Sequence, residues 1–375
     1  MQQGALDSHF DVIVLGAGPG GSAAATESAR HGLRTALVGR DSDQRPNIGE
    51  CLPPGIRPEL EKAGVWEEFL RAGHIASAGI RSVWGTPGPS DRDFVFSPYG
   101  AGWHIDRARF DAMMRNAALR CGAEAVNCSA LRRATRTDKG WQLDLRQCVV
   151  TGSLVIDATG RASVFARRIG VKRRSLDSLT GVAGYFSVRA EPVLLVEAVE
   201  NGWWYTAPLP EGRLIAVFLA DAEYIQRAAL TDPERWLALL RGAAFSAERI
   251  ARPSESETPA IRILPAESSF LEQIAGDAWI AAGDAAAAFD PLSSQGIISA
   301  IASGRAAAQT ANAWLDGDKQ ASGRYAASTR RKYAEYLAHR EIYYGIERRW
   351  PSSSFWQARQ APSAMLAANR KVLSA

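Results

Sequence analysis

A cluster of glycines close to the start of the chain has the spacing of a phosphate-binding turn. Gly16, Gly18 and Gly21 form the pattern G-x-G-x-x-G, with Gly20 inside it, directly after the apolar run at residues 10–15. In such a motif the first glycine permits a tight turn, the second lets the backbone approach a pyrophosphate, and the third lets the following helix pack against the strand. The N–H groups at the start of that helix attract anionic phosphate. The motif therefore predicts a β-α-β unit that binds a dinucleotide.

The acidic residue that usually binds the ribose is missing from the expected position after the second strand, which we place at residues 35–38. Gly39 occupies that position and Arg40 follows it. Two interpretations remain open. Either Asp41 or Asp43 binds the ribose, or Arg40 packs on the adenosine.

Two later apolar strands end in a carboxylate. Residues 153–160 read SLVIDATG, which places Asp157 at a strand end shortly before Gly160. Residues 278–284 read AWIAAGD, which places Gly283 and Asp284 at another strand end. We expect the carboxylate of Asp284 to accept hydrogen bonds from a sugar-alcohol chain.

An Ala-rich helix follows this second carboxylate. Pro291 and Gly296 bracket the turn into the helix, with Gln295 beside Gly296. The positive end of a helix dipole stabilises nearby negative charge, so this turn is a candidate site for a reduced flavin ring.

Taken in order and spacing, G-x-G-x-x-G, D-A-T-G and G-D…P…G resemble the FAD-dependent aromatic hydroxylase class, which includes the tryptophan halogenases and the geranylgeranyl reductases. The resemblance covers nearly the whole chain. It implies FAD as the cofactor, Asp284 at the ribityl chain, and Arg107 at the start of a helix beside the flavin. The chain has no second dinucleotide-binding unit, so the resemblance implies that NAD(P)H visits transiently or that an external reductant supplies the electrons.

The expected architecture is α/β, with a Rossmann-type FAD-binding domain interleaved with a β-sheet substrate domain and a helical C-terminus. Alternating or apolar segments at residues 182–188 and 203–220 predict strands of the substrate sheet. The FAD-binding domain is predicted at residues 9–77, 101–180 and 266–315, the substrate domain at 78–100 and 181–265, and the C-terminal segment at 316–375. Candidates for lining the pocket, of which about half are expected to be ordinary core residues, are Trp84, Trp103, Trp203, Trp204 and Tyr205.

The composition is that of an ordinary globular protein, with 46% hydrophobic and 22% charged residues and a net charge of +4. The basic residues are scattered, which does not favour nucleic-acid binding. No apolar run is long enough to span a membrane, and the first residues do not resemble a signal peptide, so we expect a cytoplasmic protein. The four cysteines are expected to be free thiols, and the five histidines have no metal-ligand spacing, so no metal is predicted.

The segment at residues 49–54, GECLPP, is similar to one that passes close to the flavin in the tryptophan halogenases. It makes Glu50 a candidate catalytic carboxylate near the reaction centre. A structural carboxylate is the other interpretation of Glu50. Cys51 resembles a cysteine near the flavin in some prenyl reductases, but we expect it to be a packed free thiol.

Residues 202–209, GWWYTAPL, line up with the halogenase pattern G-W-x-W-x-I-P-L, but Tyr205 and Ala207 replace the second Trp and the Ile. By spacing, Ser77 occupies the position of the halogenase lysine and Ser293 that of the halogenase glutamate. These departures argue against halogenation and favour hydroxylation.

Residues 325–359, together with DPLSSQGI, resemble the flavoproteins that help install tryptophylquinone cofactors in amine-oxidising enzymes. This resemblance implies an FAD-dependent monooxygenase that uses O2, through a flavin hydroperoxide, to hydroxylate an indole ring. The indole it implies is a Trp side chain of a partner polypeptide. Trp203 and Tyr205 would contact this substrate. The alternatives are a halogenase or hydroxylase of a small aromatic natural product, a reductase of an isoprenoid double bond, and a non-catalytic flavin-bound scaffold. The sequence leaves the oligomeric state open.

Overall fold

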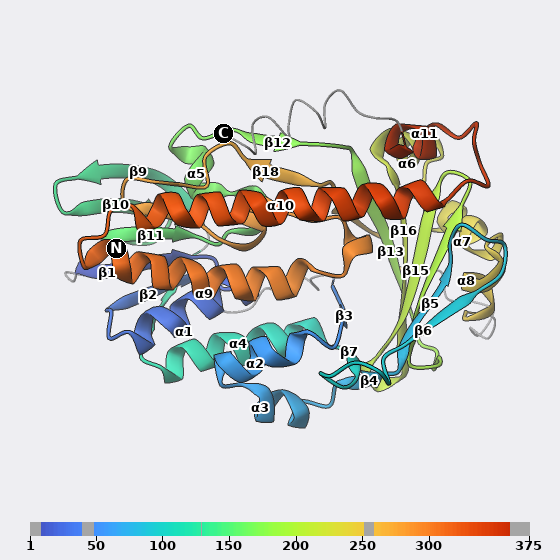
Figure 1. Ribbon diagram of the computed structural model, residues 1–375, viewed down its shortest axis with the longest axis horizontal. Helices are drawn as coiled ribbons and strands as arrows, with labels where there is room; N and C mark the ends of the chain where they lie inside the picture. Colours follow the sequence, from blue (N-terminus) through green and yellow to red (C-terminus); the bar gives the residue numbers. More distant parts are fainter. Residues whose placement is uncertain (1–8, 40–48, 129, 251–258, 361–375) are drawn as a thin grey trace.

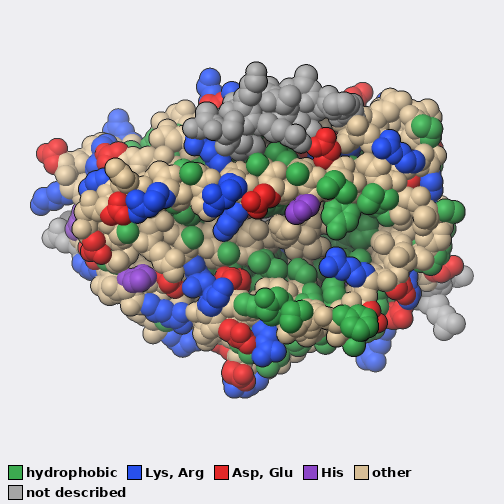
Figure 2. Space-filling model, in the orientation of Figure 1, with side chains coloured by type: hydrophobic (Ala, Val, Ile, Leu, Met, Phe, Trp, Pro, Cys, Tyr) green, Lys and Arg blue, Asp and Glu red, His purple; other side chains and the backbone are tan. Residues whose placement is uncertain are grey.

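A computed structural model describes residues 9–39, 49–128, 130–250 and 259–360. The molecule is elongated, with a mainly parallel sheet and its helices at one end and a large antiparallel sheet at the other (Figure 1). Lys and Arg side chains are interspersed with Asp and Glu on the face in Figure 2. Within the described ranges, no helix is both long enough and apolar enough to cross a membrane.

The mainly parallel sheet has eight strands, and β1 (His9–Leu15) lies near its centre. β1 pairs in parallel with β2 (Thr35–Gly39) on one side and with β11 (Val149–Asp157) on the other. Helices cover β1, so its apolar residues are buried, as is usual in a parallel sheet. The remaining strands of this sheet are β8 (Glu124–Asn127), β9 (Leu131–Thr137), β10 (Gly140–Leu145), β19 (Ala275–Gly276) and β20 (Trp279–Ala281).

Two helices that are far apart in the sequence pack closely on this sheet. They are α1 (Pro19–Arg30), which follows the glycine turn, and α9 (Gly296–Leu315). A Cβ atom on Gly304 of α9 would lie 2.0 Å from the carbonyl oxygen of Gly20 in α1, so this crossing requires glycine. The other helices at this end are α2 (Ile56–Ala63), α3 (Trp66–Arg71), α4 (Arg107–Arg120) and α5 (Val164–Arg168).

The second large sheet has seven strands in the order β17-β13-β16-β15-β14-β5-β6, and only the β14–β5 pair is parallel. All eight residues of β15 are buried because both faces of the sheet are covered. Trp204 packs against Trp236 of α7 on one face, while Trp203 and Tyr205 point to the other. The bounds are β5 (Gly79–Val83), β6 (Ser90–Asp93), β13 (Leu179–Phe186), β14 (Val193–Val199), β15 (Gly202–Leu209), β16 (Arg213–Asp221), β17 (Arg262–Pro265), α6 (Ala222–Arg227), α7 (Pro233–Arg241) and α8 (Ala244–Glu248).

Two three-stranded sheets and two C-terminal helices connect the ends of the molecule. The long helix α10 (Ala321–Ile346) runs along the molecule from the parallel sheet to the seven-stranded sheet (Figure 1). α11 (Ser354–Gln360) follows it. The small sheets consist of β3 (Cys51–Leu52), β4 (Ile75–Ser77) and β7 (Gly102–His104), and of β12 (Arg173–Ser175), β18 (Ser269–Leu271) and β21 (Ala287–Ala288).

The predicted α/β fold with a helical C-terminus is confirmed. Three of the five aromatic pocket candidates lie elsewhere. Trp84 follows β5 and packs against Tyr344 and Trp356, and its indole N–H donates to the Tyr343 carbonyl at 2.8 Å. Trp103 packs against Trp66 and Phe69 beside α3, and Trp204 belongs to the core under α7. Trp204 is fully buried and Trp103 is partly buried, and neither lines the space between the two large sheets.

Candidate functional site

One large cavity, of about 1160 Å³, lies between the parallel sheet and the seven-stranded sheet. It is lined from both sides, by turns that follow the parallel strands and by side chains of the seven-stranded sheet. The residues singled out from the sequence that line it are Gly16, Gly18, Gly20, Gly39, Glu50, Cys51, Arg107, Gly160, Gly283, Asp284, Pro291, Gly296, Trp203 and Tyr205.

The glycine turn forms one end of this cavity. Gly16 has a φ of +102°, which favours glycine. A Cβ on Gly21 would lie 1.7 Å from the carbonyl oxygen of Gly16, so Gly21 serves packing and is not a lining residue. A Cβ on Gly18 would meet nothing within 4 Å and would enter the cavity. α1 begins here without a side-chain cap, which suits phosphate oxygens.

Gly39 has a packing reason to replace the usual acidic residue. A Cβ at this position would lie 2.6 Å from the Cβ of Ala17 in the glycine turn, so no side chain fits. Arg40, Asp41 and Asp43, the candidates for the adenosine and ribose, lie outside the described residues.

Asp157 lies beneath the cavity wall and does not line the cavity. Its carboxylate is fully buried and accepts hydrogen bonds from the Thr159 N–H at 3.1 Å, the Thr159 hydroxyl at 2.6 Å and the Ala166 N–H at 2.9 Å. Burial raises the pKa of Asp157, and these hydrogen bonds oppose the rise. Asp157 therefore shapes the turn from which Gly160 faces the cavity.

Asp284 faces the cavity from the 3-10 turn η3 (Gly283–Ala285), which follows β20, and 35% of its side chain is accessible. The Arg161 guanidinium lies 3.8 Å from its carboxylate, and Arg173 donates to its backbone carbonyl at 2.8 Å. Its place deep in the protein raises the pKa of Asp284, and the two arginines oppose this rise. The carboxylate can accept hydrogen bonds from a ligand hydroxyl.

Arg107 is the first residue of α4, whose N-terminus is capped by Asp106 through the Arg109 N–H. Its guanidinium lies 3.2 Å from the Asp111 carboxylate and also lines the cavity. Gly49 has a φ of +114°, which favours glycine, and a Cβ on it would lie 2.7 Å from an Arg107 nitrogen. This arrangement fixes a positive charge beside the carboxylate of Glu50.

The turn before α9 lies across the cavity from the seven-stranded sheet. Pro291 and Gly296 line the cavity, and α9 starts at Gly296 without a side-chain cap. Gln295 is exposed and is not a lining residue. The backbone at the start of α9 can therefore face a ligand.

The half of the cavity against the seven-stranded sheet is apolar, with one buried acidic group. Trp203 and Tyr205 come from β15, and Leu194, Val217 and Leu264 come from β14, β16 and β17 of the same sheet. Such a surface suits a planar aromatic ligand.

Glu50 is the buried acid, with only 3% of its surface exposed. Its Oε2 accepts from the Gly49 N–H at 2.9 Å and lies 3.5 Å from the Tyr205 hydroxyl. Burial raises the pKa of Glu50, while the Gly49 N–H and the Arg107 charge oppose the rise. Burial and the Glu50 charge hold the pKa of Tyr205 well above its usual value. The pair can therefore hold or accept a proton next to the apolar wall.

Ser77 and Ser293, which occupy the positions of the halogenase lysine and glutamate, have hydroxyls that form hydrogen bonds with the backbone. The Ser77 hydroxyl donates to the Gly79 carbonyl at 3.3 Å, and that of Ser293 donates to the Asp290 carbonyl at 2.8 Å. Among the described lining residues there is no lysine. Cys51 lines the cavity with its Sγ 3.3 Å from the His104 Nδ1, and burial raises the pKa of the Cys51 thiol, which keeps it protonated.

These features together fit FAD. The uncapped start of α1 and the open space beside Gly18 suit a pyrophosphate, and Asp284 suits a polyhydroxyl chain. The cavity extends from there to the turn at Pro291 and the apolar wall, which leaves room for a flavin ring and an aromatic ligand.

Comparison with known proteins agrees with this geometry. The chain is 29% identical over 366 residues, 95% of its length and 98% of the relative's, to "Putative FAD-dependent oxidoreductase LodB" of Marinomonas mediterranea. Among solved structures, the myxobacterial chondrochloren halogenase CndH has a TM-score of 0.85 at 25% identity. The match covers 97% of this chain and 88% of the CndH chain. The peptidyl tryptophan dihydroxylase QhpG, essential for tryptophylquinone cofactor biogenesis, has a TM-score of 0.80 at 22% identity, with 95% of this chain covering 80% of QhpG.

Residues 9–338 match the model of a family described as an FAD-binding domain. The resemblance inferred from the motifs is confirmed, as is the expected class of FAD-dependent oxidoreductase. The matched region includes both large sheets and most of α10. The chain thus belongs to the family of proteins built on this FAD-binding domain.

Proposed function

We propose that this protein is an FAD-dependent monooxygenase that hydroxylates an indole ring, namely a Trp side chain in a partner polypeptide. The observation that carries the proposal is the large cavity that joins the glycine turn to an apolar wall holding the buried Glu50–Tyr205 pair. The likeness in fold to QhpG, which acts on a peptidyl tryptophan, supports this choice of substrate.

The proposed FAD site follows the cavity. Gly18 and the start of α1 bind the pyrophosphate, and Gly16, Gly20 and Gly21 shape this turn. Asp284 binds the ribityl chain, with Gly283 beside it, while Arg107, Pro291 and Gly296 surround the flavin ring. Asp157 contributes by holding the turn at Gly160. Gln295 contributes its backbone at the start of α9.

The proposed reaction consumes one O2, two electrons and two protons, places one oxygen atom on the ring carbon and releases the other as water. When bound, FAD supplies the chemistry of oxygen activation, with electrons from NAD(P)H or another external reductant. The apolar wall holds the ring and excludes water. In its ionised form Glu50 accepts the proton that the ring carbon loses, and Tyr205 orients the carboxylate through its hydroxyl.

Hydroxylation accounts for the cavity better than halogenation does. A halogenase of the compared pattern needs a lysine side chain near the substrate, and the described lining residues include none. The serines at the two compared positions donate to backbone carbonyls instead.

The proposal is tested by mixing the reduced, FAD-loaded protein with oxygen in the presence of a Trp-containing peptide, a matched peptide with Phe in place of Trp, or free tryptophan. We expect the Trp peptide alone to gain an oxygen atom, derived from isotopically labelled O2 and detected by mass spectrometry. Oxygen consumption with no product from any of the three substrates would contradict the proposal. Product from free tryptophan but not from the peptide would contradict the polypeptide substrate.

Glu50→Gln tests the role of the carboxyl group in the same assay. Loss of a general base typically lowers a rate by about 10² to 10⁴-fold. We expect a fall of kcat in this range with FAD binding unchanged, because the amide keeps the shape of the side chain. Full activity of the variant would contradict the assignment of Glu50 as a catalytic residue.

A further inference from the structure

A buried carboxylate connects the long helix α10 to the cavity. Asp290, which is 1% exposed, immediately precedes the 3-10 turn η4 (Pro291–Ser293). Its Oδ1 accepts from the Leu292 N–H at 2.9 Å, and its Oδ2 accepts from the Tyr344 hydroxyl at 2.8 Å and from the Arg340 Nε at 3.3 Å. The backbone N–H of Asp290 donates to the Tyr336 hydroxyl at 2.7 Å.

The three partners from α10 lie on one face of the helix. Tyr336, Arg340 and Tyr344 are spaced four residues apart, so they point in the same direction. Each is buried or nearly so, although two of them are tyrosines and one is an arginine. The helix thus presents a row of polar groups to the cavity turn instead of the apolar stripe that usually faces a core.

The same network reaches the opposite wall of the cavity. The Trp203 indole N–H donates to the Tyr344 hydroxyl at 3.1 Å. Trp203 lines the cavity from the seven-stranded sheet, whereas Pro291 and Leu292 line it from the turn before α9. Through Tyr344, one carboxylate therefore fixes residues on two facing walls.

Burying these groups is costly unless all of them are paired. Arg340 also donates to the Asp177 carboxylate at 2.8 Å, so the guanidinium lies between two acids. Burial and the Asp290 charge hold the pKa of Tyr344 well above its usual value, so its hydroxyl stays protonated and can donate. A fully satisfied buried network of this kind favours one geometry over its alternatives.

We infer that Asp290 and Tyr344 are positioning residues, which set the distance between Trp203 and the turn at Pro291–Ser293 and hence the geometry of the aromatic pocket. The inference deepens the proposed function and rests on it for the identity of the pocket's ligand. The link between the two walls is a property of the folded chain and can be measured without turnover.

The test compares Tyr344→Phe with Tyr343→Phe in the FAD-loaded protein. Tyr343 is the preceding residue on the same helix, and its side chain is 51% exposed, so it is a matched control. We expect Tyr344→Phe to raise the rate of amide hydrogen exchange at residues 290–296 by about tenfold, because Asp290 loses one donor and Trp203 its acceptor. Tyr343→Phe should exchange as the wild-type protein does.

A second readout is the fraction of oxidised reductant that appears as hydroxylated product. A misplaced ring lowers this fraction, so Tyr344→Phe should lower it severalfold while the dissociation constant of FAD changes by less than about twofold. A purely structural role of Tyr344 would change stability and leave this fraction as it was.

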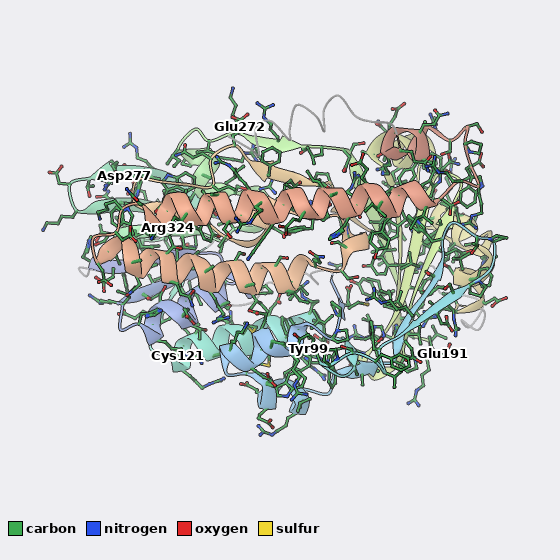
Figure 3. All side chains as sticks on the ribbon, viewed as in Figure 1. Tyr99, Cys121, Glu191, Glu272, Asp277 and Arg324 are labelled. Atoms are coloured by element: carbon green, nitrogen blue, oxygen red, sulfur yellow. The ribbon has the colours of Figure 1, made fainter. Side chains whose placement is uncertain are left out.

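Asp290→Asn removes the charge and keeps the shape, with Asp277→Asn as its control, because Asp277 lies at the far end of the molecule (Figure 3). We expect faster exchange at residues 290–296 in the first variant only. If Asp290→Asn does not fold, Tyr344→Phe decides alone. Exchange at 290–296 unchanged in Tyr344→Phe overturns the inference, whereas absence of hydroxylation in the wild-type protein contradicts only the proposed function.

Discussion

Two glycines of one motif differ in what surrounds them. A methyl group on Gly18 would enter the cavity, whereas one on Gly21 would overlap the carbonyl oxygen of Gly16. Gly18→Ala should therefore raise the dissociation constant of FAD at least about tenfold and change the free energy of unfolding of the FAD-free protein by less than about 1 kcal/mol. Fluorescence titration with FAD and urea unfolding measure the two quantities.

Gly21→Ala should instead destabilise the FAD-free protein by about 3 kcal/mol or more, because an overpacked backbone contact must be relieved. Urea unfolding of the two variants side by side provides the comparison. Equal loss of stability in both would show that Gly18 also has a packing role, contrary to the geometry of the cavity.

The buried carboxyl of Glu50 makes stability depend on pH. Its folded-state pKa is raised above the ordinary value, so folding binds a proton, and the stability from this site is present at low pH and lost as pH rises through the folded pKa. Glu50→Gln, which does not titrate, should therefore gain stability relative to wild type as pH increases from about 4.5. Unfolding free energies of both proteins between about pH 4 and 8 test this, and a difference that does not change with pH would argue against it.

The candidate site could be predicted from the sequence where a residue type is required by local geometry. Gly16, Gly18 and Gly21 belong to a motif whose spacing follows from a strand, a turn and a helix. The sequence could not explain why glycine replaces the usual acidic residue at position 39, because the reason is a close contact with Ala17 across the turn. Asp290 and Tyr344 were missed as partners because 54 residues separate them.

At the scale of elements, α1 and α9 depend on close contact at their crossing. Gly304→Ala would place a Cβ 2.0 Å from the Gly20 carbonyl oxygen and force the helices apart. We expect a loss of about 1–3 kcal/mol in the free energy of unfolding and weaker FAD binding, because both helices start at the cavity.

Gly323→Ala is the control for this change. Gly323 lies in α10, and a Cβ on it would meet nothing within 4 Å, so alanine should stabilise the protein by up to about 1 kcal/mol. The same urea series measures both variants. A stability loss in Gly323→Ala equal to that of Gly304→Ala would contradict the packing argument.

The alternation of residue types predicted strands of the substrate sheet but did not predict what packs on each face of that sheet. Residues 203–205 alternate between two apolar surroundings, and the sequence alone did not say which side faced the cavity. Trp204 and Trp203 have the same chemistry and adjacent positions. Only the packing of α7 on one face of the sheet decides between them.

At the scale of the whole molecule, FAD is expected to stabilise the parts of the chain that form the cavity. A ligand that binds only the folded state at 100 times its dissociation constant adds about 2.7 kcal/mol. Hydrogen exchange with and without FAD should show the largest protection at residues 16–21 and 283–296, and little at the edge strand β6. Equal protection by FAD along the whole chain would contradict the assignment of these residues to the FAD site.

α10 follows the strands of both large sheets in the sequence, and this order has a consequence for biosynthesis. The glycine turn and β1 are made well before β11, the strand with which β1 pairs. Tyr344, which joins the two cavity walls, follows all of these segments. Domains generally fold as units, so a domain is not completed before all of its segments have been synthesised. A nascent chain therefore carries the nucleotide-binding turn before it has a finished pocket, and the pocket geometry is completed only after α10 has been synthesised.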